Sequence, residues 1–210
     1  MRKVIFITIL FSVICGNVFS QTGRKLSESE KQVFEQKMIA QSKKIKTLQC
    51  NFTQTKTSSL VTEKATAKGI LLYHSPSALR WEYTEPTPST LILNGDNATL
   101  LNKDGKKAGN EKMFKQLGGL IINAINGESL QNSKQFSTEI YEIFNSQILV
   151  VLTPVQKRLK EFYSTIELKI DAKTLLANEI NLNEKSGDKT VISLTNKELN
   201  KEISQKKFEY

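Results

Sequence analysis

The spacing of hydrophobic residues changes along this chain from a helical period to strict alternation. A helix is expected over residues 28–46, because the capping-box pattern at 27–30 precedes apolar residues at helical spacing. Beyond it, apolar and polar side chains alternate in a series of short segments, which is the pattern of strands with one buried face. The chain is therefore expected to begin with a helix and to continue mainly as β structure.

Strong turn signals separate the expected strands. Prolines interrupt the alternation at 75–77 and 85–88, and Asn94-Gly95 between strand-like runs is typical of a β-hairpin. Strands are expected over residues 48–54, 64–74, 78–84, 89–93, 98–102, 136–144, 148–152, 162–171, 176–182 and 191–195, with Phe208 and Tyr210 ending a last one. Strands and helices do not alternate, so the sheet should be antiparallel.

A second helix is expected within the β region, over about 111–125. The apolar side chains expected to form its lid face are Met113, Phe114, Leu117, Leu120 and Ile121. Gly118 and Gly119 lie in the middle of this helix, and each costs roughly 1 kcal/mol relative to alanine. Two interpretations stay open: the helix is a movable element, or it is a packed core helix in which a glycine permits close approach.

About ten short strands with two amphipathic helices predict a mainly β protein with helices (α+β), an incomplete antiparallel β-barrel covered by a helical lid. The side chains expected on its inner face are Phe52, Leu79, Trp81, Tyr83, Leu91, Leu93, Phe136, Ile166 and Leu168. Ordinary core packing explains each of them taken singly. A gap between lid and sheet, however, would exclude water and hold acyl chains, at roughly 0.8 kcal/mol per buried methylene.

Residues 1–20 have the pattern of a secretory signal peptide. A basic start at 1–3 precedes an apolar run over 4–14, which is too short to span a bilayer, and small residues precede the expected cleavage after Ser20. A lipoprotein signal is the alternative, because Cys15 follows the run, but Ile14 stands where a small residue is needed. We therefore expect export to the periplasm and a single domain over 21–210.

Neither charge nor reactive side chains indicate catalysis. The net charge is +9, but the lysines are scattered and no nucleic-acid motif accompanies them. His74 is the only histidine and no nucleophile-elbow motif occurs. Cys50 is the only cysteine beyond the expected signal peptide, so a metal site of histidine and cysteine is excluded and the thiol is expected to be buried. No enzyme activity, cofactor or metal is therefore expected.

Several segments, taken in order, resemble the bacterial outer-membrane lipoprotein carrier family, LolA. The segment 48–54 resembles the opening strand of the family, with Gln54 ending its Phe-x-Gln core. The stretch 75–83 followed by Pro86, with Arg80-Trp81 inside it, resembles the most recognisable part of the family. Asn94-Gly95, Thr153-Pro154 and the segment 185–196 resemble its later hairpins. The similar features extend from about residue 30 to 210.

The resemblance implies a monomeric periplasmic carrier without cofactor or catalysis. Its partners would be the acyl chains of lipoproteins, an inner-membrane lipoprotein-releasing complex and an outer-membrane acceptor, without nucleic acid. Ser75 stands where well-studied members carry a basic residue that helps to hold the lid closed, so the lid control and the cargo are expected to differ. Two alternatives stay open: a carrier or sensor of another lipid or glycolipid, and a secreted β-protein with a packed core that binds no ligand.

Overall fold

The computed structural model describes residues 23–210 apart from 62–63, 96, 109–110, 128–129 and 131–133, and it does not describe the side chains of 111–114, 116–117 and 126. The expected signal peptide therefore lies outside the described residues. The strands are β1 (Arg24–Lys25), β2 (Thr47–Thr57), β3 (Lys64–His74), β4 (Ala78–Glu85), β5 (Ser89–Asn94), β6 (Asn97–Leu101), β7 (Phe136–Ile143), β8 (Gln147–Pro154), β9 (Tyr163–Asp171), β10 (Ala177–Glu184) and β11 (Lys189–Leu199). The helices are α1 (Glu28–Ser42), α2 (Glu111–Asn126), α4 (Lys157–Phe162) and the 3₁₀ helix η1 (Gln205–Phe208).

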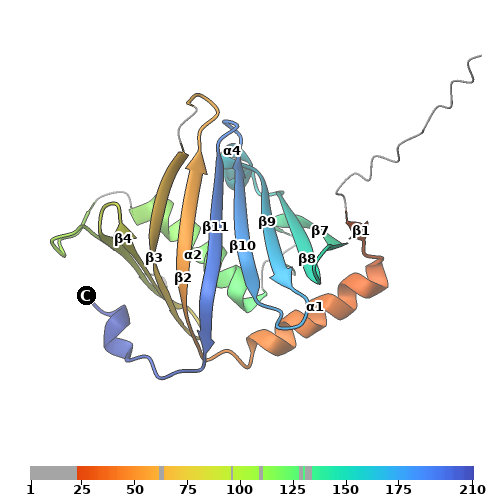
Figure 1. Cartoon of the computed structure of the whole chain (residues 1–210), viewed down its shortest axis with the longest axis horizontal. Coiled ribbons are helices and arrows are strands. Elements are labelled where there is room, and N and C mark those ends of the chain that lie inside the picture. Colours follow the sequence, from red (N-terminus) through yellow and green to blue (C-terminus); the bar gives the residue numbers. More distant parts are fainter. Residues whose placement is uncertain (1–22, 62–63, 96, 109–110, 128–129, 131–133) are drawn as a thin grey trace, which may run out of the picture.

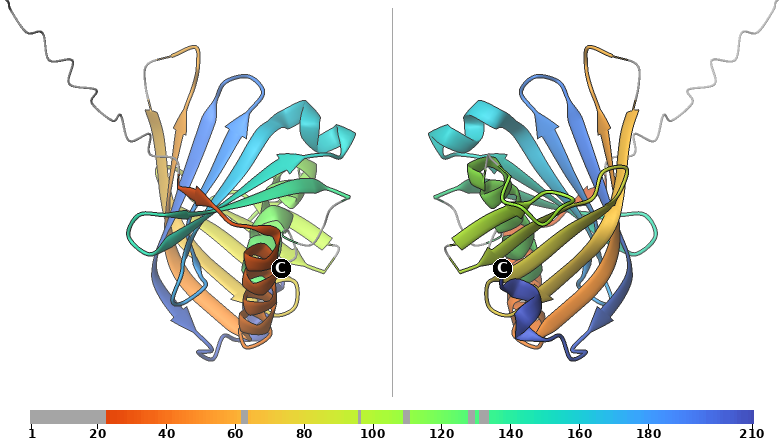
Figure 2. Two further views of the ribbon diagram at one scale, coloured as in Figure 1. Left: turned by 90° about the vertical axis from the view of Figure 1, so that its right-hand side faces the viewer. Right: turned by 90° about the vertical axis from the view of Figure 1, so that its left-hand side faces the viewer.

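All described strands form one antiparallel sheet in the order β1-β7-β8-β9-β10-β11-β2-β3-β4-β5-β6. Two meanders, β2 to β6 and β7 to β11, join where β11 pairs with β2. The edge strands β1 and β6 do not pair with each other, so the barrel stays open. The sheet curls around α2 and α1 in the side views (Figure 2), and α1 runs along its lower end (Figure 1). The predicted incomplete antiparallel barrel with a helical cover is confirmed.

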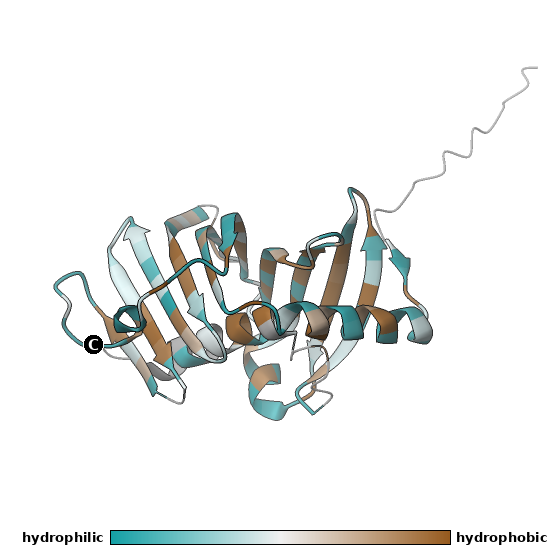
Figure 3. Cartoon of the chain, turned by 90° about the horizontal axis from the view of Figure 1, so that it is seen from below, coloured by the Kyte–Doolittle hydropathy of each residue, from teal (hydrophilic) through white to brown (hydrophobic). Residues whose placement is uncertain are grey.

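The concave face of the sheet forms the hydrophobic core. In β2, Leu48, Cys50 and Phe52 are buried on this face, whereas Gln49 and Asn51 are exposed on the other. The pairing register continues the apolar face into the neighbouring strands, since Phe52 lies opposite Leu194 and Cys50 lies opposite Leu71. The alternation of brown and teal along the strands in Figure 3 shows the same division. The period-two pattern of the sequence thus positions the core.

Helix α1 begins as predicted and ends earlier than predicted. The capping box is complete, because the Ser27 backbone N–H donates to Glu30 Oε2 at 2.8 Å and the Glu30 N–H donates to Ser27 Oγ at 3.4 Å. Phe34 and Met38 are buried against the core. The helix ends at Ser42, and Ile45 reaches the core from the turn that follows.

Three local predictions are wrong, and one short strand was missed. The strand β1 was not expected, and a two-residue strand is too short to show alternation. Phe162 does not begin a strand but ends helix α4, where Leu159 is the buried residue and Phe162 is 53% exposed. Phe144 lies beyond β7 in a turn and is 73% exposed.

The third wrong prediction is the final strand. Residues Gln205–Phe208 form η1, which contacts β4 and β5. Phe208 is 1% exposed, and Ile92, which faces away from the inner face of β5, is also buried. The segment with Phe208 therefore lies against β4 and β5 (Figure 1), and hydrophobicity alone could not distinguish this cover from another strand. Among the described helices, none is long and apolar enough to cross a membrane.

Candidate functional site

An aromatic cluster lies on the inner face where β2, β3 and β4 run side by side. The ring centroids of Phe52 and Trp81 are 4.2 Å apart. The rings of Phe52 and Tyr83 are nearly perpendicular, and their centroids lie 5.2 Å apart. Gly69 lies opposite both Phe52 and Tyr83 in the sheet. A Cβ at Gly69 would come within 2.6 Å of the Phe52 ring, so the glycine makes room for the aromatic stack.

Two polar groups accompany these rings. The Tyr83 hydroxyl donates to Gln54 Oε1 at 2.9 Å, which places Gln54 of the family-like motif inside the barrel. Burial raises the pKa of Tyr83, and the neighbouring Trp81 and Gln54 side chains oppose that rise. The buried Trp81 indole N–H has no hydrogen-bond partner with good geometry among the described residues. The interior is therefore apolar, with a few polar groups beside the aromatic rings.

Helix α2 covers β4, β5 and β6 on this inner face. Ile121 is fully buried under the helix, and Leu120 packs partly buried against the same core. A Cβ at Gly118 would lie 2.2 Å from Leu93 Cδ1, whereas a Cβ at Gly119 would meet nothing within 4 Å. Gly118 is thus the close-approach glycine of the packed-helix interpretation, and mobility of α2 stays a prediction.

The two glycines form a matched pair for testing this packing. We expect Gly118→Ala to lower the free energy of unfolding by about 1–3 kcal/mol, because the buried Leu93 must move. Gly119→Ala should raise it by up to about 1 kcal/mol, since alanine is the better helix former and has open space. Urea denaturation followed by circular dichroism measures both. Equal effects of the two substitutions would contradict tight packing of Gly118.

The second half of α2 leaves a narrow space above β2, β10 and β11, which we call the lid gap. Its walls are Leu48, Ala124, Ile125, Leu175, Leu176, Ala177, Leu194 and Lys197. The gap has a volume of about 20 Å³, enough for about one water molecule. An acyl chain can enter this space only if α2 moves away from the sheet.

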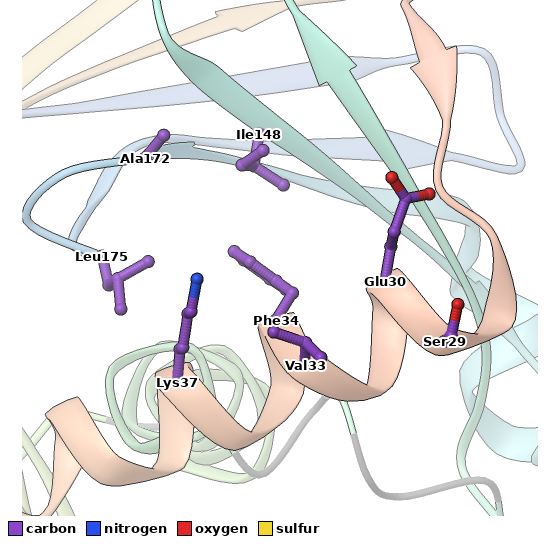
Figure 4. A pocket seen from close by; sticks show the side chains of 8 residues that line it. All are labelled: Ser29, Glu30, Val33, Phe34, Lys37, Ile148, Ala172 and Leu175. Atoms are coloured by element: carbon purple, nitrogen blue, oxygen red, sulfur yellow. The ribbon is translucent and has the colours of Figure 1, made fainter.

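A larger pocket lies beneath α1, and we call it the α1 groove. It has a volume of about 400 Å³ and is lined by Ser29, Glu30, Val33, Phe34, Lys37, Ile148, Ala172 and Leu175. Phe34, Ile148 and Leu175 point toward one another across it (Figure 4). Glu30 is engaged by Arg24 at 3.0 Å, at one end of the groove. Leu175 lines both the α1 groove and the lid gap, so the two spaces are neighbours.

The turn between β9 and β10 holds Leu175 between these spaces. Asp171 accepts hydrogen bonds from the backbone N–H groups of Thr174 and Lys173, at 2.7 and 3.0 Å. These hydrogen bonds lower the pKa of Asp171, and the bond from Thr174 has the largest effect. Leu175 follows with a φ of 57°, in the left-handed region that is uncommon for such a residue. The turn therefore fixes an apolar side chain at the junction of groove and gap.

The predicted cavity residues all lie on the inner face of the sheet. The buried ones are Phe52, Leu79, Trp81, Leu91, Leu93, Phe136, Ile166 and Leu168, and Tyr83 is partly buried. They form two groups, because Phe136, Ile166 and Leu168 belong to β7 and β9 on the other side of the β11–β2 junction. None of these residues lines the lid gap or the α1 groove.

The other predicted residues have different positions. Met113, Phe114 and Leu117 lie outside the described side chains, so only Leu120 and Ile121 of the predicted lid face can be placed. Arg80 lies on the convex face, where its side chain donates to Glu82 at 2.8 Å and to the Lys207 carbonyl at 3.3 Å. Pro86 follows β4 and is exposed. Arg80 therefore contacts the C-terminal segment rather than the lid.

Among the side chains that the structure describes, no basic group of the turn at Ser75 contacts α2. The Ser75 backbone N–H donates to the Lys46 carbonyl at 2.8 Å. The neighbouring His74 contacts Gln205 of η1 at 3.0 Å and faces the Phe208 ring. The described part of α2 is held by apolar packing of Gly118 and Ile121.

Sequence reasoning missed the residues that line the two spaces. Val33 and Phe34 were interpreted only as helix residues, and Ile148 only as part of an apolar strand. Leu175 lies in a turn and Lys197 lies in a polar stretch of β11, so neither shows a pattern of burial. Both helices were expected to cover the barrel, but the spacing of α1 did not indicate which of its side chains would line a groove.

Reactive chemistry is absent from the described part of the site. No cluster of three or more histidine, cysteine, aspartate or glutamate side chains suited to a metal occurs there. Cys50 is buried, and burial raises the pKa of its thiol to about 12. A thiol with such a pKa carries almost no thiolate at neutral pH, so Cys50 is a small apolar core residue.

These features define the class of protein: an open antiparallel barrel with an apolar inner face and a helical cover. The model of one family, the outer membrane lipoprotein carrier protein LolA, matches residues 43–210. The chain belongs to this family. No curated protein sequence matches the chain.

Several solved structures are similar in fold. A LolA superfamily protein from Nitrosomonas europaea is 10% identical with a TM-score of 0.45, over 84% of this chain and 97% of that one. The lipoprotein LppX from Mycobacterium tuberculosis is 10% identical with a TM-score of 0.47, over 85% of this chain and 99% of that one. A chain of the MucA/MucB complex from Pseudomonas aeruginosa is 10% identical with a TM-score of 0.48, over 86% of this chain and 61% of that one. Membership of the family rests on the family model, not on these distant structures.

Proposed function

We propose that this protein is a periplasmic carrier that binds the acyl chains of lipoproteins and shuttles them from the inner to the outer membrane. It acts without catalysis, as a monomer with residues 1–20 removed. It receives its cargo from an inner-membrane lipoprotein-releasing complex and delivers it to an outer-membrane acceptor.

The observation that carries this proposal is the gap between α2 and an apolar sheet in a member of the LolA family. An acyl chain that separates α2 from Leu48 and Leu194 would exchange water for apolar walls, at roughly 0.8 kcal/mol per methylene. The neighbouring α1 groove offers further apolar surface at Phe34, Ile148 and Leu175. The signal-peptide pattern of residues 1–20 supports the periplasmic location.

Native mass spectrometry of the protein isolated from its own periplasm tests the proposal. We expect a bound lipoprotein whose lipid extract contains acylated cysteine. Depletion of the protein should also leave lipoproteins in the inner membrane, as measured by membrane fractionation. An empty protein that also rejects apolar dyes would contradict acyl binding and favour a β-protein that acts through its surface.

A second candidate is a carrier or sensor of another lipid or glycolipid with the same fold. Ser75 favours it, because no basic side chain of this turn reaches α2 among the described residues. The same lipid extraction separates the two candidates. A bound lipid without a protein part, together with unchanged lipoprotein sorting, would support the second and overturn the first.

A further inference from the structure

A bulge in β11 directs one lysine toward the apolar interior. Thr195 pairs with Asn51 and Glu198 pairs with Gln49, so Asn196 and Lys197 together lie opposite Cys50. Asn196 has a φ of 51°, in the left-handed region that asparagine tolerates. An extra residue in a strand changes which face the following side chain takes. Lys197 consequently lines the lid gap instead of alternating with Leu194 onto the convex face.

The ammonium group of Lys197 is hydrogen-bonded to an amide and not, among the described residues, to a carboxylate. Its Nζ donates to Asn178 Oδ1, and it makes no salt bridge with any residue that the structure describes. The other walls of the lid gap are Leu48, Ala124, Ile125, Leu175, Leu176, Ala177 and Leu194, all apolar. The group is half-buried, and this burial lowers the pKa of Lys197, while Cys50 and Asp171 oppose the effect.

A half-buried cation without an ion-pair partner, here influenced only at longer range by Asp171, loses hydration that an anion of the ligand could replace. The exposed Lys201, close by in sequence, is arranged differently, because it makes a salt bridge with Glu198 at 2.7 Å. Position matters as well, because Lys197 is the one charged wall of the lid gap. An amphiphile with its chain between α2 and the sheet would therefore have its head group beside Lys197 and Asn178.

We propose that Lys197 and Asn178 form an anion subsite of the lid gap, so that the preferred acylated ligand carries a carboxylate or phosphate head. The proposal rests on the acyl binding of the proposed function, because the chain of the ligand occupies the lid gap. The acylated cysteine of a lipoprotein carries neither a carboxylate nor a phosphate at its lipid head, so a preference for such a head favours the second candidate, a carrier of another lipid. It adds that the head group is selected by charge, which apolar walls alone cannot do.

Three ligands with the same sixteen-carbon chain test this subsite: palmitate, hexadecyl phosphate and hexadecanol. Binding to the purified, lipid-stripped protein is measured by calorimetry, below the aggregation concentration of each ligand. We expect at least one of the two anions to bind about tenfold more tightly than the alcohol, equivalent to about 1.4 kcal/mol. Whichever anion binds more tightly identifies the head as carboxylate or phosphate.

Variants at Lys197 separate charge from packing. Lys197→Met should bind the anions and hexadecanol equally, and Lys197→Arg should keep the preference. Lys201→Met is the matched control, since it removes an exposed positive charge of the same region and should change nothing. Circular dichroism confirms that each variant is folded.

The outcomes distinguish the two proposals. Equal binding of all three ligands to the unchanged protein would overturn the anion subsite and leave acyl binding intact. A preference that survives Lys197→Met would likewise overturn it. Failure to bind any of the three ligands would overturn acyl binding in the lid gap, and with it the anion subsite.

Discussion

Replacing Gly69 by alanine should lower the free energy of unfolding by about 3 kcal/mol, the upper part of the usual range for overpacking. A Cβ there would lie 1.9 Å from the Glu82 carbonyl oxygen and 2.6 Å from the Phe52 ring. The carbonyl belongs to the backbone of β4, so it cannot move aside as the end of a flexible side chain could. Denaturation with urea measures the change in midpoint.

A double-mutant cycle shows which contact carries this effect. Phe52→Leu removes the ring that the new methyl group would strike, but it leaves the Glu82 carbonyl in place. We expect Gly69→Ala to be less damaging in the Phe52→Leu background, by about 0.5–3 kcal/mol of coupling. Full additivity would mean that the backbone contact with Glu82 alone sets the cost. A neutral Gly69→Ala would contradict the aromatic packing described for this end of the barrel.

Local chemistry explains why much of the fold was predictable from the sequence. The capping box at Ser27 and Glu30 satisfies the start of α1 with side chains that lie beside it in the chain. Asn94-Gly95 also acts locally, and Gly95 has a φ of 57° in the hairpin between β5 and β6. Alternation then assigns each strand residue to a face.

The errors arise where tertiary contacts decide the outcome. Phe208 is buried where η1 contacts β4 and β5, and no local signal distinguishes this role from a strand. Phe162 has the right parity to continue the alternation of β9, yet the preceding residues form α4 and leave it exposed. In both cases the apolar residues do alternate with polar ones, but the segment forms a helix and not the strand that this pattern predicts.

In the candidate site, too, the residues in regular strands were predictable and those in a bulge or a turn were not. Alternation placed Phe52 and Trp81 on the inner face, because both lie in regular parts of β2 and β4. Lys197 lies inside because of a bulge, which breaks the alternation that sequence reasoning depends on. Leu175 lines both spaces from a turn held by Asp171, and turn residues carry no face assignment.

Trp81 is expected to be the side chain whose loss is most damaging to this barrel. It is 1% exposed and packs on Phe52, with 4.2 Å between the two ring centroids. Trp81→Ala should lower the free energy of unfolding by about 3–5 kcal/mol, because it removes a large buried ring and leaves a cavity. For a domain whose total stability is typically about 5–15 kcal/mol, this is a large fraction. Urea denaturation followed by far-ultraviolet circular dichroism measures it without the tryptophan signal.

Trp81→Phe is the matched variant, because it keeps an aromatic ring and removes only the indole N–H and part of the volume. Burying an unpaired donor costs about 1–3 kcal/mol, so its removal offsets some of the lost packing. We therefore expect Trp81→Phe to stay within about 1 kcal/mol of the unchanged protein. If instead Trp81→Phe is as damaging as Trp81→Ala, the indole N–H has a stabilising partner after all. The Tyr83 hydroxyl would be the first to test, by Tyr83→Phe, because the Trp81 side chain already influences the pKa of Tyr83.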